Sequence, residues 1–178
     1  MEQRQQNLNW EDKPQVKKGD IGEDAVERYL EGQGYIVYKP MTDAAHPFDR
    51  FCVKDKTDIF IAEVKTKPKR KYYPDTGFNY KHYKEYLYMQ DEKKIPVFIF
   101  FVDEESGSIY GNWLKNMAEE KTIQHNNKLI NYPKIENEII YFPIESMRDI
   151  EALKEGEIES IKELYTGNYG NLTSGIKI

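Results

Sequence analysis

A chain of 178 residues is long enough for one domain with a sizeable hydrophobic core. Its net charge of −5 argues against a protein that coats nucleic acid through a broad basic surface, because counterion release drives such binding; a local basic groove is still allowed. The single cysteine, Cys52, excludes an internal disulfide framework and a cysteine-based zinc site.

The apolar segments are short. The longest run, IPVFIFFV at 95–102, falls well below the roughly 18 residues of a membrane-spanning helix, and the N-terminal segment MEQRQQNLNWEDK is polar. We therefore expect no membrane partner and a cytoplasmic protein. In that reducing compartment Cys52 is expected to be a small buried hydrophobe between Phe51 and Val53.

The first elements are a helix and a strand. Residues 1–18 lack a periodic apolar pattern and predict a weakly ordered arm. A helix is predicted over about 20–31, where apolar residues recur at three- and four-residue spacing. The β-branched and aromatic run at 35–40 predicts a strand that ends at a proline.

A β-hairpin follows, with strands near 48–54 and 58–66. If its turn is centred on Lys56, residues on opposite strands have numbers that sum to 112. Asp49 then lies opposite Glu63, and both carboxylates share one face of the hairpin. A slip of one residue would break this pairing.

The later elements are less regular. The run at 95–103 has no polar alternation and predicts a strand covered on both faces, at the centre of the sheet. The other expectations are a turn at 75–77, a helix at 78–91, a strand at 108–114, a short helix ending at Met117, a loop at 120–137, a strand at 138–144, and helical segments from a capping box at 146–149 to Tyr165. The domain organisation predicted is an arm at 1–18, one domain at 19–166 and a flexible tail at 167–178.

Asp49, Glu63 and Lys65 form the candidate site. Two facing carboxylates repel each other unless a cation neutralises them, and Mg²⁺ commonly takes one or two carboxylates together with water and phosphate oxygens. Lys65 points into the same space as Glu63, because alternate residues of a strand share a face. The alternative is an exposed face of solvated charges, which Ile59 and Ile61 on that face make less natural.

These residues resemble a known superfamily. A helix with the early acid Glu23, a strand, Pro47-Phe48-Asp49 and then Glu63-Val64-Lys65 is similar to the PD-(D/E)xK, or restriction-endonuclease-like, phosphodiesterases, which include Holliday junction resolvase-like and phage nucleases. The resemblance covers roughly 19–103, and Phe48 interrupts the strict Pro-Asp dipeptide. It implies an α/β fold with an αβββαβ core, in which helices flank a mixed central sheet.

The resemblance also implies a function, a Mg²⁺-dependent deoxyribonuclease in which Mn²⁺ can substitute. It implies Asp49, Glu63, Lys65 and Glu23 as catalytic residues, and Asp49, Glu63 and Val64 as metal ligands. For Glu23, a first-turn residue favoured by the helix dipole is the alternative. Because the superfamily includes inactive members, a nuclease-fold module that binds nucleic acid or a protein partner is the alternative function. A third reading is an acidic interaction protein in which the triad is accidental.

A basic and aromatic run adjoins the candidate site. Such a run suits phosphate contact and base stacking, although an ordinary solvated loop is the alternative. His46 could assist, and Tyr80, Tyr83 and Tyr86 have the spacing of core residues. Members of the superfamily are commonly dimers, which leaves a homodimer open. The residues expected to contact DNA are Lys67, Lys69, Arg70, Lys71, Tyr72, Tyr73, Lys81, Lys84 and His46.

Overall fold

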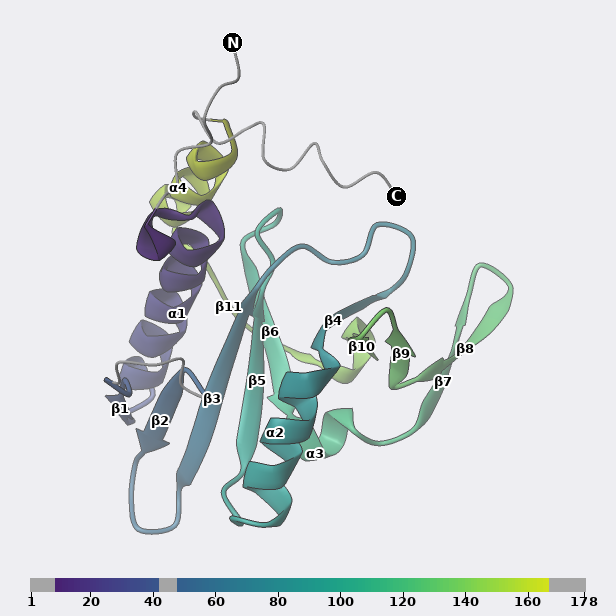
Figure 1. Cartoon of the computed structure of the whole chain (residues 1–178), viewed down its shortest axis with the longest axis horizontal. Coiled ribbons are helices and arrows are strands. Elements are labelled where there is room, and N and C mark those ends of the chain that lie inside the picture. Colours follow the sequence, from purple (N-terminus) through teal and green to yellow (C-terminus); the bar gives the residue numbers. More distant parts are fainter. Residues whose placement is uncertain (1–8, 42–47, 167–178) are drawn as a thin grey trace.

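The structure of the protein, a computed structural model, describes residues 9–41 and 48–166. Its main sheet has six strands, and Figure 1 shows them side by side. The parallel pair β3 and β5 lies between antiparallel neighbours, so the sheet is mixed. The strand order is β1 (Ile36–Tyr38), β2 (Arg50–Val53), β3 (Ile59–Thr66), β5 (Val97–Val102), β6 (Ser108–Trp113) and β11 (Arg148–Ala152).

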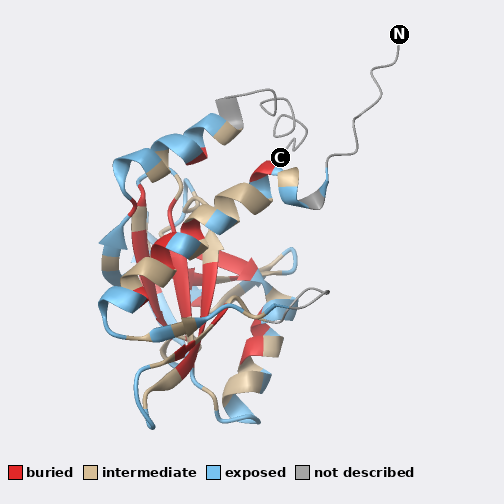
Figure 2. Ribbon diagram, turned by 90° about the vertical axis from the view of Figure 1, so that its left-hand side faces the viewer, coloured by how far each residue is buried: buried red, intermediate tan, exposed pale blue. Residues whose placement is uncertain are grey.

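Helices cover both faces of this sheet. On one face α1 (Pro14–Gly32) and α4 (Glu155–Thr166) pack over a core that includes Phe60, Ala62 and Val64 of β3. On the other face α2 (Tyr80–Asp91) and α3 (Leu114–Met117) pack over Ile61 and the odd-numbered residues of β5. In Figure 2 the buried residues gather in the sheet and on the helix sides that face it. The α/β fold with a mixed central sheet flanked by helices is therefore as predicted.

The central strand and the hairpin also agree with the sequence. Five of the six residues of β5 are buried, and they contribute to the cores on both faces of the sheet. Cys52 on β2 is buried and unpaired, and burial raises the pKa of its thiol to about 12. Cys52 is therefore a small buried hydrophobic residue, as its neighbours Phe51 and Val53 in the sequence indicated.

Two small sheets lie outside the main one. The first has three strands in the order β4 (Asp75–Asn79), β10 (Ile139–Pro143) and β9 (Lys134–Glu136). The second is a hairpin of β7 (Lys121–His125) and β8 (Lys128–Tyr132), which projects at one side of Figure 1. Short 3₁₀ turns at Trp10–Asp12 and Ile144–Ser146 complete the elements.

Several sequence predictions need correction. Helix α1 begins at Pro14, so 14–18 belong to the helix and not to an arm; proline suits the first helical position because its missing N–H is not needed there. The expected turn at 75–77 is part of strand β4, and the expected loop at 120–137 contains β7, β8 and β9. The polarity of the β7–β8 hairpin concealed it, since only Ile123 and Tyr132 of its two strands are buried.

The expected helix at 146–149 is also wrong. Residues Arg148–Ala152 form strand β11, which pairs with β6 at the edge of the main sheet, and the helix starts only at Glu155. Pairing with an open sheet edge outweighed the local capping pattern. No helix within the described ranges is long and apolar enough to span a membrane.

Candidate active site

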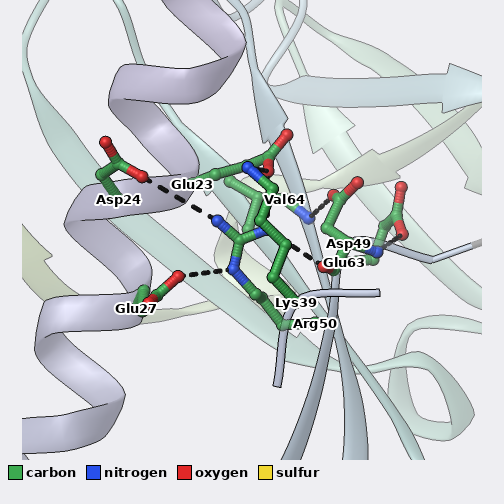
Figure 3. Close-up of polar contacts among 8 residues, drawn as sticks. All are labelled: Glu23, Asp24, Glu27, Lys39, Asp49, Arg50, Glu63 and Val64. Carbon is green, nitrogen blue, oxygen red and sulfur yellow. Dashed lines mark hydrogen bonds and ion pairs between the residues drawn. The ribbon is translucent and has the colours of Figure 1, made fainter. Parts of the chain in front are cut away.

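The register of the hairpin brings the two predicted carboxylates together. From Arg50 opposite Ala62 to Val53 opposite Ile59, the paired residue numbers sum to 112, as predicted. Just beyond this ladder, the Val64 N–H donates to Asp49 Oδ2 at 2.7 Å, and the Asp49 N–H donates to Glu63 Oε2 at 3.2 Å. Figure 3 shows both contacts. Asp49, immediately before β2, thus faces Glu63 on β3.

Glu63 is the more enclosed of the two acids. Its side chain is 3% exposed, and its Oε1 accepts hydrogen bonds from Lys65 Nζ and from the Tyr86 hydroxyl. Tyr86 belongs to α2 and packs against Phe78 in the core. Burial, and then the charge of Glu63, raises the pKa of Tyr86, so its hydroxyl keeps its proton and donates. The carboxylate of Glu63 is fixed from three directions.

The surroundings of Asp49 disfavour its ionised carboxylate. Burial, and then the charge of Glu63, raises the pKa of the Asp49 carboxyl to about 6, although Lys65 and the Val64 N–H act in the opposite direction. A half-buried acid with a raised pKa beside a second acid is typical of a functional site. A divalent cation at this position would offset both causes of the raised pKa, the burial of Asp49 and its repulsion from Glu63.

Lys65 completes the group predicted from the sequence. Burial lowers the pKa of Lys65, but the charges of Glu63 and Asp49 outweigh it and the net shift is upward. The ammonium therefore stays charged at neutral pH, and its side chain is still 21% exposed. The Tyr86 ring lies 5.8 Å from Lys65 Nζ. With Asp49 ionised, the three side chains carry a net charge of −1.

Glu23 approaches the pair from the other side of the sheet. It lies on α1, where its Oε2 accepts a hydrogen bond of 2.7 Å from Arg50 Nη1 (Figure 3). Burial, and then the charge of Asp49, raises the pKa of Glu23, against the opposing effect of Arg50. Glu23 is therefore within electrostatic reach of Asp49, and its carboxylate is bound to Arg50.

Arg50 is a feature that the sequence reasoning missed. Its side chain is 1% exposed, and it also donates to Glu27 Oε2 at 2.7 Å and to the Asp49 carbonyl at 3.0 Å. The signal was available, because an arginine next to Asp49 on the strand must point to the opposite, helix-covered face and needs acidic partners there. Arg50 ties α1 to the strand that carries Asp49.

Tyr86 and His82 were also missed. Helical spacing predicted Tyr86 as a core residue, which it is, but nothing in the spacing indicated its hydrogen bond to Glu63. His82, one turn earlier on α2, is exposed, with its ring 6.3 Å from that of Tyr86. Burial, and then the charge of Lys65, lowers the pKa of His82. Helix α2 thus contributes a polar wall to the site.

The basic run divides into half-buried members with polar partners and exposed members. Lys67 donates to the Gly77 carbonyl, and Lys69 lies 3.5 Å from the buried Asp103. Arg70 donates twice to Asp75 and once to Glu136, so it serves as a structural ion pair and we leave it out of the proposed DNA surface. His46 lies outside the described residues. The exposed members are Lys71, Tyr72, Tyr73, Lys81 and Lys84.

The donor set is compatible with a hard divalent cation. In the described part of the chain, no group of three or more His, Cys, Asp or Glu side chains is gathered as a metal site. The protein would therefore offer two carboxylates, and water, backbone or phosphate oxygens would supply the rest, which suits Mg²⁺. Val64, predicted as a ligand, is present at the site through its N–H, which donates to Asp49.

Comparisons with known proteins give a distant likeness in structure only. No protein-family model matches the chain, and no curated protein sequence matches it. Among solved structures, the chain is similar to Hjc, a Holliday junction resolvase from the archaeal hyperthermophile Archaeoglobus fulgidus, with a TM-score of 0.48 and 8% identity. The likeness covers 72% of this chain and 90% of that one. The functional argument rests on the site itself.

Proposed function

We propose that this protein is a Mg²⁺-dependent deoxyribonuclease that hydrolyses DNA phosphodiester bonds, with Mn²⁺ able to substitute. The observation that carries the proposal is the pair Asp49 and Glu63, which face each other at the start of β2 and on β3, with Lys65 hydrogen-bonded to Glu63. The raised pKa of Asp49 supports it, because the site is electrostatically incomplete without a further positive charge.

In this proposal Asp49 and Glu63 hold the cation. When bound, the cation supplies Lewis acidity toward a phosphate oxygen and activates water for hydrolysis. Lys65 places its ammonium beside the reacting phosphate, where it orients the attacking water or stabilises the developing negative charge. Tyr86 keeps the Glu63 carboxylate in position through its hydroxyl. Glu23, held by Arg50, adds negative charge at the edge of the site.

A catalytically inactive module that binds nucleic acid or a protein is the second candidate. One observation favours it: Lys65 already neutralises Glu63 by direct contact, as a purely structural ion pair would. The two candidates differ in what the acids do. A binding module needs no metal at Asp49, whereas the nuclease loses its activity without one.

The test is cleavage of labelled duplex, single-stranded and four-way-junction DNA in Mg²⁺, Mn²⁺ or EDTA. Wild type is compared with Glu63→Gln and Lys65→Ala, and with Glu151→Gln, an exposed acid on the edge strand β11, as a control. We expect metal-dependent cutting that both site variants lose and the control keeps. Binding without cutting under every condition would establish the inactive module, and cutting by Glu63→Gln at the wild-type rate would overturn the site. Whether the protein forms a homodimer is a separate question, and analytical ultracentrifugation of the same samples answers it.

A further inference from the structure

A groove lies between the segment after β3 and the β7–β8 hairpin. In Figure 1 the chain leaves the end of β3, arches across the molecule toward the side of this hairpin and then turns back to β4. The residues that line the groove come from both sides, and the hairpin residues among them were predicted only as a loop. They include Tyr72, Tyr73, His125, Lys128, Leu129 and Lys134.

The lining combines exposed flat apolar surface with positive charge. Tyr72 is 72% exposed and Leu129 is 75% exposed, which is unusual for large hydrophobic side chains. Lys128 contributes positive charge, Lys134 is paired with Glu136 just outside the groove, and the residues that line the groove include no aspartate or glutamate. In a chain with a net charge of −5, this is a local surface of the opposite sign.

The two tyrosines differ in how they are held. The Arg70 guanidinium lies 4.2 Å from the centre of the Tyr73 ring, and Lys134 Nζ lies 5.5 Å from it. Lys134 also forms an ion pair of 2.5 Å with Glu136, which keeps that lysine in place. Tyr73 is thus a fixed wall of the groove. Tyr72, next to Lys71, presents its ring to solvent.

We propose that this groove binds an unpaired stretch of DNA strand next to the cleavage site; the inference rests on the proposed nuclease function. Exposed aromatic rings with cations beside them suit single strands, because every unpaired base has a face that can stack. The bases of a duplex already stack on each other and present only their edges in the grooves. Tyr72 stacks a base, while Lys71 and Lys128 contact the adjacent phosphates.

The chain connects this groove to the site. Lys65 and Lys67 end strand β3 and its continuation, and the same segment carries Lys71 and Tyr72 four to seven positions further on. A strand that leaves the reacting phosphate along this segment would meet positive charge first and then the exposed ring. The substrate class that fits is DNA with a single-stranded part beside the bond that is cut.

The test measures binding of a fluorescent single-stranded oligonucleotide and of a duplex of the same sequence, by anisotropy in EDTA. Without metal the probe stays intact, so the result is independent of whether the protein cuts DNA. Tyr72→Ala is compared with Tyr38→Ala, an equally truncated exposed tyrosine on β1. We expect Tyr72→Ala to weaken single-strand binding by about tenfold, as loss of one stacked base does. Duplex binding should stay unchanged.

A second variant tests the charges. Lys128→Ala should reduce the slope of log affinity against log salt by about one for the single strand, whereas Lys56→Ala, in the distant β2–β3 turn, should not. Wild-type affinity in both groove variants, or an equal loss of duplex binding, would overturn the groove proposal even if the protein cleaves DNA. If the wild type cleaves no DNA but the two groove variants still lose single-strand binding, the nuclease proposal is refuted. The groove is then a single-strand binding site without nuclease activity.

Discussion

At the scale of single residues, the central feature is an acid that the fold keeps in an unfavourable state. The Asp49 carboxyl is half-buried beside Glu63, and its pKa rises from 3.8 to about 6. The folded protein therefore disfavours ionised Asp49, and this cost is present above pH 6 and absent below about pH 3.8. Site geometry that lowers stability in this way is typical of functional positions.

Asp49→Asn should therefore stabilise the metal-free protein. The amide is neutral at all pH values and its oxygen can still accept from the Val64 N–H, so the variant avoids the cost of ionisation. We expect a gain of roughly 1–3 kcal/mol in the free energy of unfolding at pH 8, shrinking as the pH falls through 6 toward 4. Urea unfolding across this pH range measures it, and a variant less stable than wild type at pH 8 would contradict the assignment.

Tyr86 supplies the second residue-scale prediction. Tyr86→Phe keeps the ring against Phe78 but removes the only donor that α2 places on Glu63 Oε1. We expect a loss of about 1–2 kcal/mol in stability, because a hydrogen bond to a charged group in a buried place is lost. Tyr83→Phe, a buried tyrosine one turn earlier, is the control. Equal effects of the two variants in urea unfolding would argue that the Glu63 contact contributes nothing.

At the scale of elements, the site depends on how closely α1 lies on β3. Gly22 allows this approach: a Cβ at this position would come within 2.0 Å of Thr66 Oγ1 and 3.4 Å of a Val102 methyl. Glu23 is the next residue on the helix, so this close packing is what brings its carboxylate to Arg50 and the edge of the site.

Gly22→Ala should destabilise the protein, although alanine is the better helix former. The added methyl group overpacks the contact with β3, which costs about 1–3 kcal/mol, more than the gain of about 1 kcal/mol in helix propensity. Gly19→Ala on the same helix is the matched control, because nothing lies within 4 Å of its added Cβ, and it should stabilise. Thermal unfolding distinguishes the two. Parallel gains in both variants would contradict the close packing.

The same scale shows what the sequence could and could not predict. The turn centred on Lys56 was enough to give the hairpin register and the facing acids, because the two strands pair outward from it without a bulge. The β7–β8 hairpin has too few buried residues for a pattern. Strand β11 depends on its partner β6, which lies about 40 positions away in the chain, and no local signal contains that pairing. Arg50 and Tyr86 show the same limit at the site, since their partners come from other elements.

At the scale of the whole molecule, the main sheet brings segments that are far apart in sequence into one hydrophobic core. Strands β6 and β11 and helix α4 come from beyond 103, and they complete the same sheet and core as the elements before it. Strands β7 to β10 contribute to the two small sheets, of which the β7–β8 hairpin forms one wall of the groove. The candidate site and the proposed strand-binding groove therefore belong to different sheets, connected by the segment that follows β3.

The central claim is that Asp49 and Glu63 together hold a divalent cation. Electron paramagnetic resonance of free Mn²⁺ during titration with the protein tests it most directly, because bound Mn²⁺ is lost from the free signal. We predict saturable binding that Mg²⁺ displaces and that Asp49→Asn and Glu63→Gln each abolish, while Glu151→Gln binds as wild type does. Unaltered Mn²⁺ binding in both site variants, or no binding by the wild type, would contradict the account.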